Sequence, residues 1–152
     1  MSMTNSVARV VLGLVLVLAL ALVGCGGGQS EVSGDDYTIF VHRGSLFSRG
    51  GVDAGIVGTL TTRDGCVLLE QEESGTAYPV VWPSGTSIYA EDPLTLELPS
   101  GEKLAVGQTV SGGGGSYSSS SDAVKVDIPA ECRRGTSEVW VFNPDDDPSV
   151  VE

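Results

Sequence analysis

The sequence predicts a small all-β domain, and three observations predict it. Short runs of Val, Leu, Thr and aromatic residues recur along the chain, turns rich in Gly, Pro or Asp separate them, and no long segment shows the 3.6-residue period of an amphipathic helix. Strands of this length and spacing favour a closed or nearly closed barrel over an open sheet. We therefore expect a small OB-like barrel of five or six strands, with a β-sandwich as the alternative.

The first half of the domain contains one clear hairpin. Residues 57–61 and 66–70 flank Asp64-Gly65, and this dipeptide between β-prone runs is a strong hairpin signal because the turn requires positive φ. A third strand is expected over 77–82, where a Pro-Ser-Gly turn follows.

The second half of the domain has strand patterns on both sides of a segment with few apolar residues. A second hairpin is expected over 94–98 and 103–106, and a last strand over 138–142. Residues 111–121 are Gly and Ser with a single Tyr, which favours a low-complexity loop. The Pro that begins 129–133 favours one helical turn there.

Residues 1–24 have the pattern of a lipoprotein signal peptide. Arg9 gives the start a positive charge, residues 10–23 are apolar or glycine, and Gly24 then precedes Cys25. A helix of this apolar stretch covers only ~21 Å, which is short of the ~30 Å hydrocarbon core. A permanent transmembrane helix is therefore the weaker interpretation.

Cys25 is the residue that we expect to carry the lipid. Leu22-Val23-Gly24-Cys25 resembles the bacterial lipobox, in which the cysteine thiol takes a diacylglycerol and the chain is cut just before it. Two acyl chains pass the threshold for stable anchoring that one chain misses. The alternative is a chance cysteine behind an uncut signal anchor. We expect an exported chain that this lipid holds on the outer face of the cell membrane, at the cell envelope.

The mature chain is long enough for one domain. Cleavage before Cys25 leaves 128 of the 152 residues. Residues 25–55 are expected to form a flexible tether and an irregular lead-in. The barrel is expected over 56–143, and 144–152 is expected to be an acidic, solvated tail.

The charge of the chain excludes one class of partner. Removal of residues 1–24 takes away one of the eight basic residues and none of the 20 acids, so the formal net charge changes from −12 to −13. Such a surface repels phosphate backbones and anionic head groups. We therefore expect no nucleic-acid binding, and we expect the membrane contact to be the lipid on Cys25.

The other two cysteines form a separate pair. Cys66 and Cys132 remain after Cys25, and an exported protein meets an oxidising compartment. We expect a disulfide between them, which would stabilise the fold by ~4 kcal/mol because it restricts the unfolded chain. A metal pair or a redox couple is the alternative. Both are disfavoured, because the only histidine, His42, lies far away in sequence and no Cys-x-x-Cys is present.

Catalytic machinery is scarce in this sequence. A Ser-His-Asp or Cys-His system needs a histidine base, and His42 falls outside the predicted barrel. No Gly-x-Ser-x-Gly, Walker or His-Glu-x-x-His motif occurs. The glycine run 112–115 is not followed by an expected helix whose N-terminus could bind phosphate. We expect no enzymatic activity, no metal and no other cofactor.

Paired carboxylates are the remaining catalytic candidates. Glu70, Glu72 and Glu73 follow one expected strand, and Glu91 and Asp92 precede another. Such acids serve glycosidases or bind a hard cation, which leaves a carbohydrate-active or other hydrolase as the alternative function. Solvated surface charge is the favoured interpretation at each position.

The aromatic residues could form a binding face. Trp82 and Trp140 could line a surface for a sugar or a peptide, although packing in the core or at a rim is the commoner role of tryptophan. Trp140 alternates with Val139 and Val141 and is expected to face the opposite way. Tyr117, inside the Gly/Ser loop, is the aromatic expected to be free to contact a partner.

A family resemblance is carried by short segments that span residues 56–142. The segments that carry it are 58–60, 65–69, 78–85, 106–107, 128–132 and 139–141. Together they resemble a family of uncharacterised, largely actinobacterial, cell-envelope lipoproteins with one small β-domain. The resemblance implies a compact extracytoplasmic domain with paired cysteines, and it implies no activity.

The predicted function is binding at the cell envelope. The anchor at Cys25, the crosslinked β-domain and the missing catalytic motifs favour a non-enzymatic lipoprotein that binds an envelope protein or a glycan. A hydrolase that uses acids among Glu70, Glu72, Glu91 and Asp92 is the alternative. A purely structural envelope component is a third hypothesis.

Overall fold

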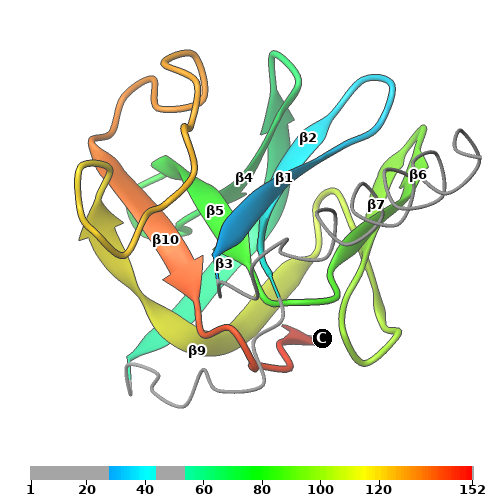
Figure 1. Cartoon of the computed structure of the whole chain (residues 1–152). Helices are drawn as coiled ribbons and strands as arrows, with labels where there is room; N and C mark the ends of the chain where they lie inside the picture. The colour runs from blue at the N-terminus through cyan, green and yellow to red at the C-terminus, as the bar shows by residue number, and fades with distance from the viewer. Residues whose placement is uncertain (1–27, 44–53, 152) are drawn as a thin grey trace, which may run out of the picture.

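The computed structural model describes residues 28–43 and 54–151, and within these ranges the chain is all-β without a helix (Figure 1). No helix long and apolar enough to cross a membrane occurs among these residues. The predicted signal peptide and the lipid-carrying Cys25 lie outside the described residues.

The strands within the described ranges have the following bounds. They are β1 (Gln29–Ser33), β2 (Thr38–His42), β3 (Gly55–Arg63), β4 (Cys66–Glu70), β5 (Ala77–Trp82), β6 (Ser87–Glu91), β7 (Leu94–Glu97), β8 (Lys103–Ala105), β9 (Thr109–Ser118), β10 (Glu138–Phe142) and β11 (Ser149–Val151).

The strands form one mixed sheet and one small sheet. In the mixed sheet β2, β4, β3, β9, β10 and β5 are joined in this order, and a parallel pairing of β5 with β2 closes the path into a ring. β1 pairs with β2, β11 pairs with β9, and β4 also pairs with β5. β6, β7 and β8 form a separate antiparallel sheet at one side (Figure 1). The predicted all-β class is confirmed.

The two predicted hairpins are present. β3 and β4 pair in antiparallel register across Asp64-Gly65, and both turn residues have positive φ, 52° and 80°. These are the values that a two-residue hairpin turn of type I′ requires. β7 and β8 form the second hairpin, with Leu96 opposite Leu104. The single strands expected over 77–82 and 138–142 are β5 and β10.

The flexible tether and irregular lead-in predicted for 25–55 are wrong over residues 29–42. β1 and β2 form an antiparallel hairpin there, and the other edge of β2 pairs in parallel with β4 and then with β5. Ile39 and Val41 are buried in the core. The sequence of β1 carries little apolar alternation, so its strand conformation depends on the partner strand rather than on a local pattern. The domain therefore includes residues well before 56.

The low-complexity loop predicted for 111–121 is also wrong. Most of it belongs to β9, which pairs with β3 along its first half and with β10 along its second half. A Cβ on Gly114 would lie 2.6 Å from Ile56 Cδ1. The glycines therefore allow a close approach of backbone and side chains, which outweighs their weak strand propensity.

The solvated tail predicted for 144–152 is wrong in part. Ser149–Val151 forms β11, which continues along the same edge of β9 that β10 occupies further on. Asp146 Oδ2 accepts a hydrogen bond from the Gly113 amide at 2.8 Å, and Asp147 Oδ1 accepts one from the Ser100 amide at 3.1 Å. The acidic residues thus tie the tail to the domain.

Two further local predictions differ from the structure. β6 lies where the sequence pattern predicted no strand. Residues 129–133 form consecutive turns, with the Cys132 amide 3.0 Å from the Pro129 carbonyl oxygen, but they are not a helix.

The larger core lies within the ring, because all six ring strands contribute to it. The small sheet packs leucines onto the same cluster. The cluster consists of Ile39, Val41, Ile56, Leu60, Val67, Leu69, Val80, Trp82, Leu94, Leu96, Leu98, Leu104, Val110, Trp140 and Phe142.

A second core lies on the opposite face of β2, β4, β5 and β10, where alternate residues such as Phe40 and Leu68 point. Ile128 and Cys132 from the long connection between β9 and β10 cover it. The predicted disulfide between Cys66 and Cys132 is present, with 5.5 Å between the Cα atoms, and it fastens this connection to β4.

Candidate functional site

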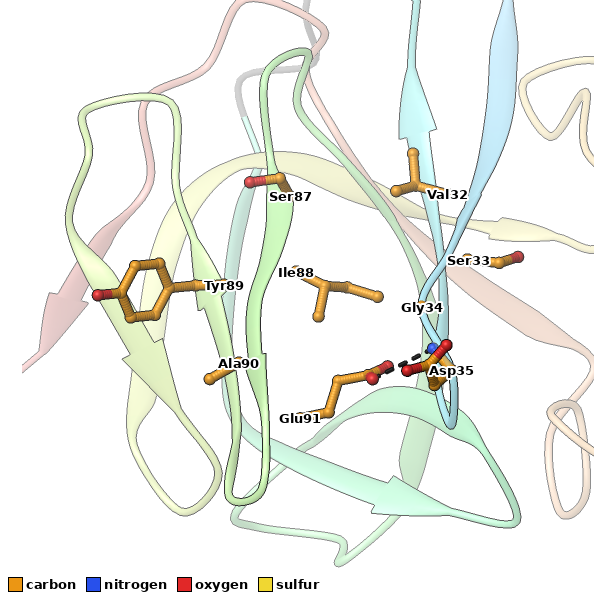
Figure 2. Close-up of a pocket in the computed structure, with 9 residues that line it drawn as sticks. All are labelled: Val32, Ser33, Gly34, Asp35, Ser87, Ile88, Tyr89, Ala90 and Glu91. Carbon is orange, nitrogen blue, oxygen red and sulfur yellow. Dashed lines mark hydrogen bonds between the residues drawn. The ribbon is translucent and has the colours of Figure 1, made fainter.

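The candidate site is a groove of about 410 Å³ between the two sheets (Figure 2). Its lining comes from the end of β1 and the turn that follows, residues 32–35, and from all of β6, residues 87–91. Ligand sites in proteins commonly enclose ~300–1,000 Å³, so the groove lies within this range of sizes.

Both walls of the groove are edge strands. Within the described ranges β1 pairs with β2 alone, and β6 pairs with β7 alone. An edge strand presents backbone N–H and C=O groups that no neighbouring strand satisfies. The groove therefore lies between two strands, each of which has one edge without a strand partner in the described ranges.

The apolar part of the groove is continuous with the core. Val32 and Ile88 are partly buried against the larger cluster, and their side chains extend from the two walls into the space between β1 and β6 (Figure 2). Tyr89 points away from the groove and is 62% exposed. The register of β6 shifts between Ile88 and Ala90, which places Tyr89 at an irregularity of the strand.

The Lys103 ammonium group occupies one face of the Tyr89 ring. Lys103 Nζ lies 3.7 Å from the ring centroid, and the same ammonium group forms an ion pair with Glu97. A cation over an aromatic face is attracted by the ring quadrupole. This cluster lies on the small sheet, on the side of β6 that Tyr89 faces.

Glu91 closes one end of the groove. Its carboxylate accepts a hydrogen bond from the Asp35 amide at 3.1 Å (Figure 2). It also accepts hydrogen bonds from the amides of Asp36 and Tyr37, at 3.2 and 3.4 Å. A Cβ on Gly34 would overlap the Glu91 carboxylate, so only glycine permits this approach. The side chain of Glu91 thus joins the small sheet to the turn between β1 and β2.

The predicted carboxylate candidates are not gathered in one place. Glu70 ends β4 and Glu72 and Glu73 lie exposed in the following turn, whereas Glu91 and Asp92 belong to the β6–β7 hairpin of the other sheet. Among residues 28–43 and 54–151, no group of three or more His, Cys, Asp or Glu residues could hold a metal ion. Of these acids only Glu91 lines the groove.

His42 lies inside the domain, contrary to the prediction. It ends β2, and its Nε2 is 2.9 Å from the carbonyl oxygen of Phe142, to which it donates because a carbonyl only accepts. Burial lowers the pKa of His42 from its ordinary value of 6.5, the hydrogen bond to Phe142 raises it, and Lys125 also lowers it. Ser84 Oγ donates to the His42 carbonyl at 3.0 Å. His42 therefore fastens the ends of parallel strands to one another.

The predicted aromatic candidates lie in the cores. Trp82 is 0% exposed and stacks on Phe142 at 5.4 Å between ring centroids, and Trp140 stacks on Tyr78 at 4.6 Å. Trp140 belongs to the larger core while its two neighbours belong to the second one, as the alternation predicted. Tyr117 was expected to be free, but as a residue of β9 it packs against the second core.

Sequence reasoning missed the groove because its walls come from segments that are distant in the chain. Ser87–Glu91 contains Ile88 and Ala90 at alternate positions, a weak strand signal that could have indicated β6. No local signal in Gln29–Ser33 indicates that Val32 would face β6. The meeting of the two segments depends on the tertiary fold.

No protein-family model, no curated protein and no solved structure matches the sequence or the fold. The resemblance to envelope lipoproteins stays a prediction.

Proposed function

We propose that the chain is a lipoprotein of the cell envelope, anchored by diacylglycerol on Cys25, whose β-domain binds an envelope protein or a glycan without catalysing a reaction. The membrane and this unidentified envelope molecule are its partners, and nucleic acid is not one. No metal or other cofactor takes part in the proposal.

The observation that carries the anchoring part is the order of segments at the start of the sequence. A short apolar stretch after one basic residue leads directly into Leu22-Val23-Gly24-Cys25. The disulfide between Cys66 and Cys132 supports export, because such crosslinks persist in oxidising compartments.

The observation that carries the binding part is the groove between β1 and β6. Unpaired backbone edges and the half-buried Val32 and Ile88 offer both hydrogen bonds and apolar surface to a ligand. The competing hydrolase hypothesis has no comparable support, since Glu91 uses its carboxylate to accept backbone hydrogen bonds.

We also propose that the ring of strands is a small OB-like barrel. Two features support this description: the β5–β2 pairing closes the ring, and every ring strand contributes residues to the core. The parallel pairings of β2 and the extra sheet of β6, β7 and β8 would then be additions to the barrel.

The anchor is tested by metabolic labelling in a bacterial host with an alkyne analogue of palmitate. We expect the wild-type chain to take up the label and to sediment with membranes, and Cys25→Ala to lose both properties. Cys66→Ser/Cys132→Ser is the matched control, because it removes the other two cysteines, which form the disulfide, and should keep the label. Equal labelling of Cys25→Ala and wild type would refute the anchor.

A further inference from the structure

We propose that the groove between β1 and β6 binds an extended, basic peptide segment of an envelope protein, which adds as a strand to the open edge of β6. This inference rests on the proposed binding function and names the class of ligand. The inference rests on three features that meet in one groove: two edge strands, apolar side chains on the walls and acidic side chains around them.

Strand addition fits the backbone of the groove. β6 runs over Ser87–Glu91 and has β7 on one edge only within the described part of the chain. A peptide that pairs with an exposed edge gains main-chain hydrogen bonds, and pockets for every second side chain supply specificity. At ~3.3 Å per residue, β6 can pair with about five residues of a ligand.

The apolar residues on the walls of the groove fit a peptide with apolar side chains at alternate positions. Val32 and Ile88 face the space from opposite walls and are only partly buried in the unliganded chain (Figure 2). A strand lying between the walls would bury both of them under its inward-facing residues. Its outward-facing residues would remain in solvent, so their identity matters less for binding.

The charge around the groove selects a basic ligand. Asp35 and Glu91 line it, and the described lining residues include no Lys or Arg. The nearby cation Lys103 is held by Glu97 and by the Tyr89 ring. The chain that remains after removal of residues 1–24 carries a formal net charge of −13, which attracts a basic segment and speeds its encounter with the site.

Two other occupants are less compatible with these observations. A second copy of the chain would bring an equal negative charge to an acidic groove, and like charges oppose association. A glycan usually stacks on an exposed aromatic face, whereas Trp82 and Trp140 are buried and Tyr89 points away from the groove.

The test uses the mature lipid-anchored protein in nanodiscs and a random peptide phage library, with empty nanodiscs for counter-selection. We expect the selected peptides to carry Lys or Arg and to have apolar residues at alternate positions. Synthetic copies should bind with affinities measured by fluorescence anisotropy, and binding should slow amide hydrogen exchange in Ser87–Glu91.

Three variants locate the binding site. Ile88→Lys places on one wall of the groove a positive charge that repels a basic peptide, and it should weaken peptide binding at least tenfold. Asp35→Lys replaces an exposed acidic side chain with a basic one and should also weaken binding. Val57→Lys is the matched control, since Val57 is a 53% exposed apolar residue of β3 outside the groove, and it should bind as the wild type does. Melting temperatures establish that each variant is folded.

Each remaining outcome overturns the inference in a recognisable way. Peptides that bind equally well to both groove variants would place the site elsewhere and would leave the proposed binding function intact. Selection of acidic or uncharged peptides would contradict the charge argument. Binding on a glycan array without any peptide binding would show that the ligand is a glycan rather than a peptide. If neither the glycan array nor the peptide library yields binding, the proposed function is refuted as well.

Discussion

Glu91 illustrates how much one side chain contributes to the arrangement of the groove. Its side chain extends from the last residue of β6, an edge strand of the small sheet, and accepts three backbone hydrogen bonds from the turn between β1 and β2. A carboxylate that accepts N–H groups forms stronger hydrogen bonds than a neutral acceptor. Glu91 therefore sets how the end of β6 lies against that turn.

Replacement of Glu91 should loosen the turn between β1 and β2. We expect Glu91→Ala to lower the free energy of unfolding by about 1–2 kcal/mol, because three amides lose a charged acceptor. Glu91→Gln keeps an acceptor oxygen and should lose less. Amide hydrogen exchange at Asp35, Asp36 and Tyr37 should accelerate in the alanine variant. Unchanged exchange at these three amides would show that water replaces the carboxylate without cost.

His42 should make stability depend on pH in a defined direction. Its pKa in the folded chain is lowered from 6.5 by burial, so the unfolded chain binds more protons between the two pKa values. The contribution of His42 is therefore fully present above pH 6.5 and is lost as the pH falls through the folded-state pKa. Because the sequence has a single histidine, its NMR titration is unambiguous and should give a pKa below 6.5.

The matched variant for this titration is His42→Gln. Glutamine can still donate a side-chain N–H toward the Phe142 carbonyl, but it does not titrate. The wild type should lose more stability than this variant between pH 7.5 and 5.5, as measured by urea denaturation. Identical losses in the two proteins would mean that carboxylates alone govern the acid response.

At the scale of elements, β9 departs most from the sequence expectation. A Gly/Ser segment with almost no apolar surface pairs with three other strands along its length. Gly114 lies so close to the Ile56 side chain that there is no room for a Cβ atom. Composition alone indicates a loop here, because local propensity does not include the partners that supply the hydrogen bonds.

Alanine substitutions should distinguish the glycines that the packing requires from those that it tolerates. Gly114→Ala should lower the free energy of unfolding by about 1–3 kcal/mol through overpacking. Gly55→Ala, in the adjacent strand β3, is the control, because a Cβ there meets nothing within 4 Å. It should change stability by less than about 1 kcal/mol. Urea denaturation of both variants provides the comparison, and equal effects would contradict the packing at Gly114.

At the scale of the whole molecule, the disulfide holds a segment with little structure of its own. The connection between β9 and β10 covers the second core with Ile128 and Cys132, and Cys66 binds it to β4. The crosslinked residues are 66 positions apart in sequence, so the bond closes a long loop of the unfolded chain.

Removal of the disulfide should lower the free energy of unfolding by about 4 kcal/mol, mainly because the unfolded chain gains freedom. Cys66→Ala/Cys132→Ala tests this by urea denaturation of the protein. A reducing agent should destabilise the wild type and leave the double variant unchanged. Similar stability of the two proteins without reductant would indicate a strained or dispensable crosslink.

The elements predicted correctly are those whose signals are local. The Asp64-Gly65 turn, the alternation of Leu94 and Leu96, and the aliphatic runs of β5 and β10 each carry their own pattern. β1, β9 and β11 carry none, and each becomes a strand because a partner from elsewhere in the chain satisfies its backbone. The candidate groove was not predicted for the same reason, since Val32 and Ile88 are 56 positions apart.

The sequence by itself determined the all-β class, the β3–β4 and β7–β8 hairpins and the pairing of Cys66 with Cys132, and it carries the predicted anchor at Cys25. Only the tertiary structure decided that the ring closes through β2, that glycine-rich β9 lies between β3 and β10, and that β1 and β6 border a groove. The physical reason is the range of the interactions. Turn geometry and side-chain alternation act between near neighbours, whereas strand pairing and close packing act between segments whose separation in sequence no local pattern records.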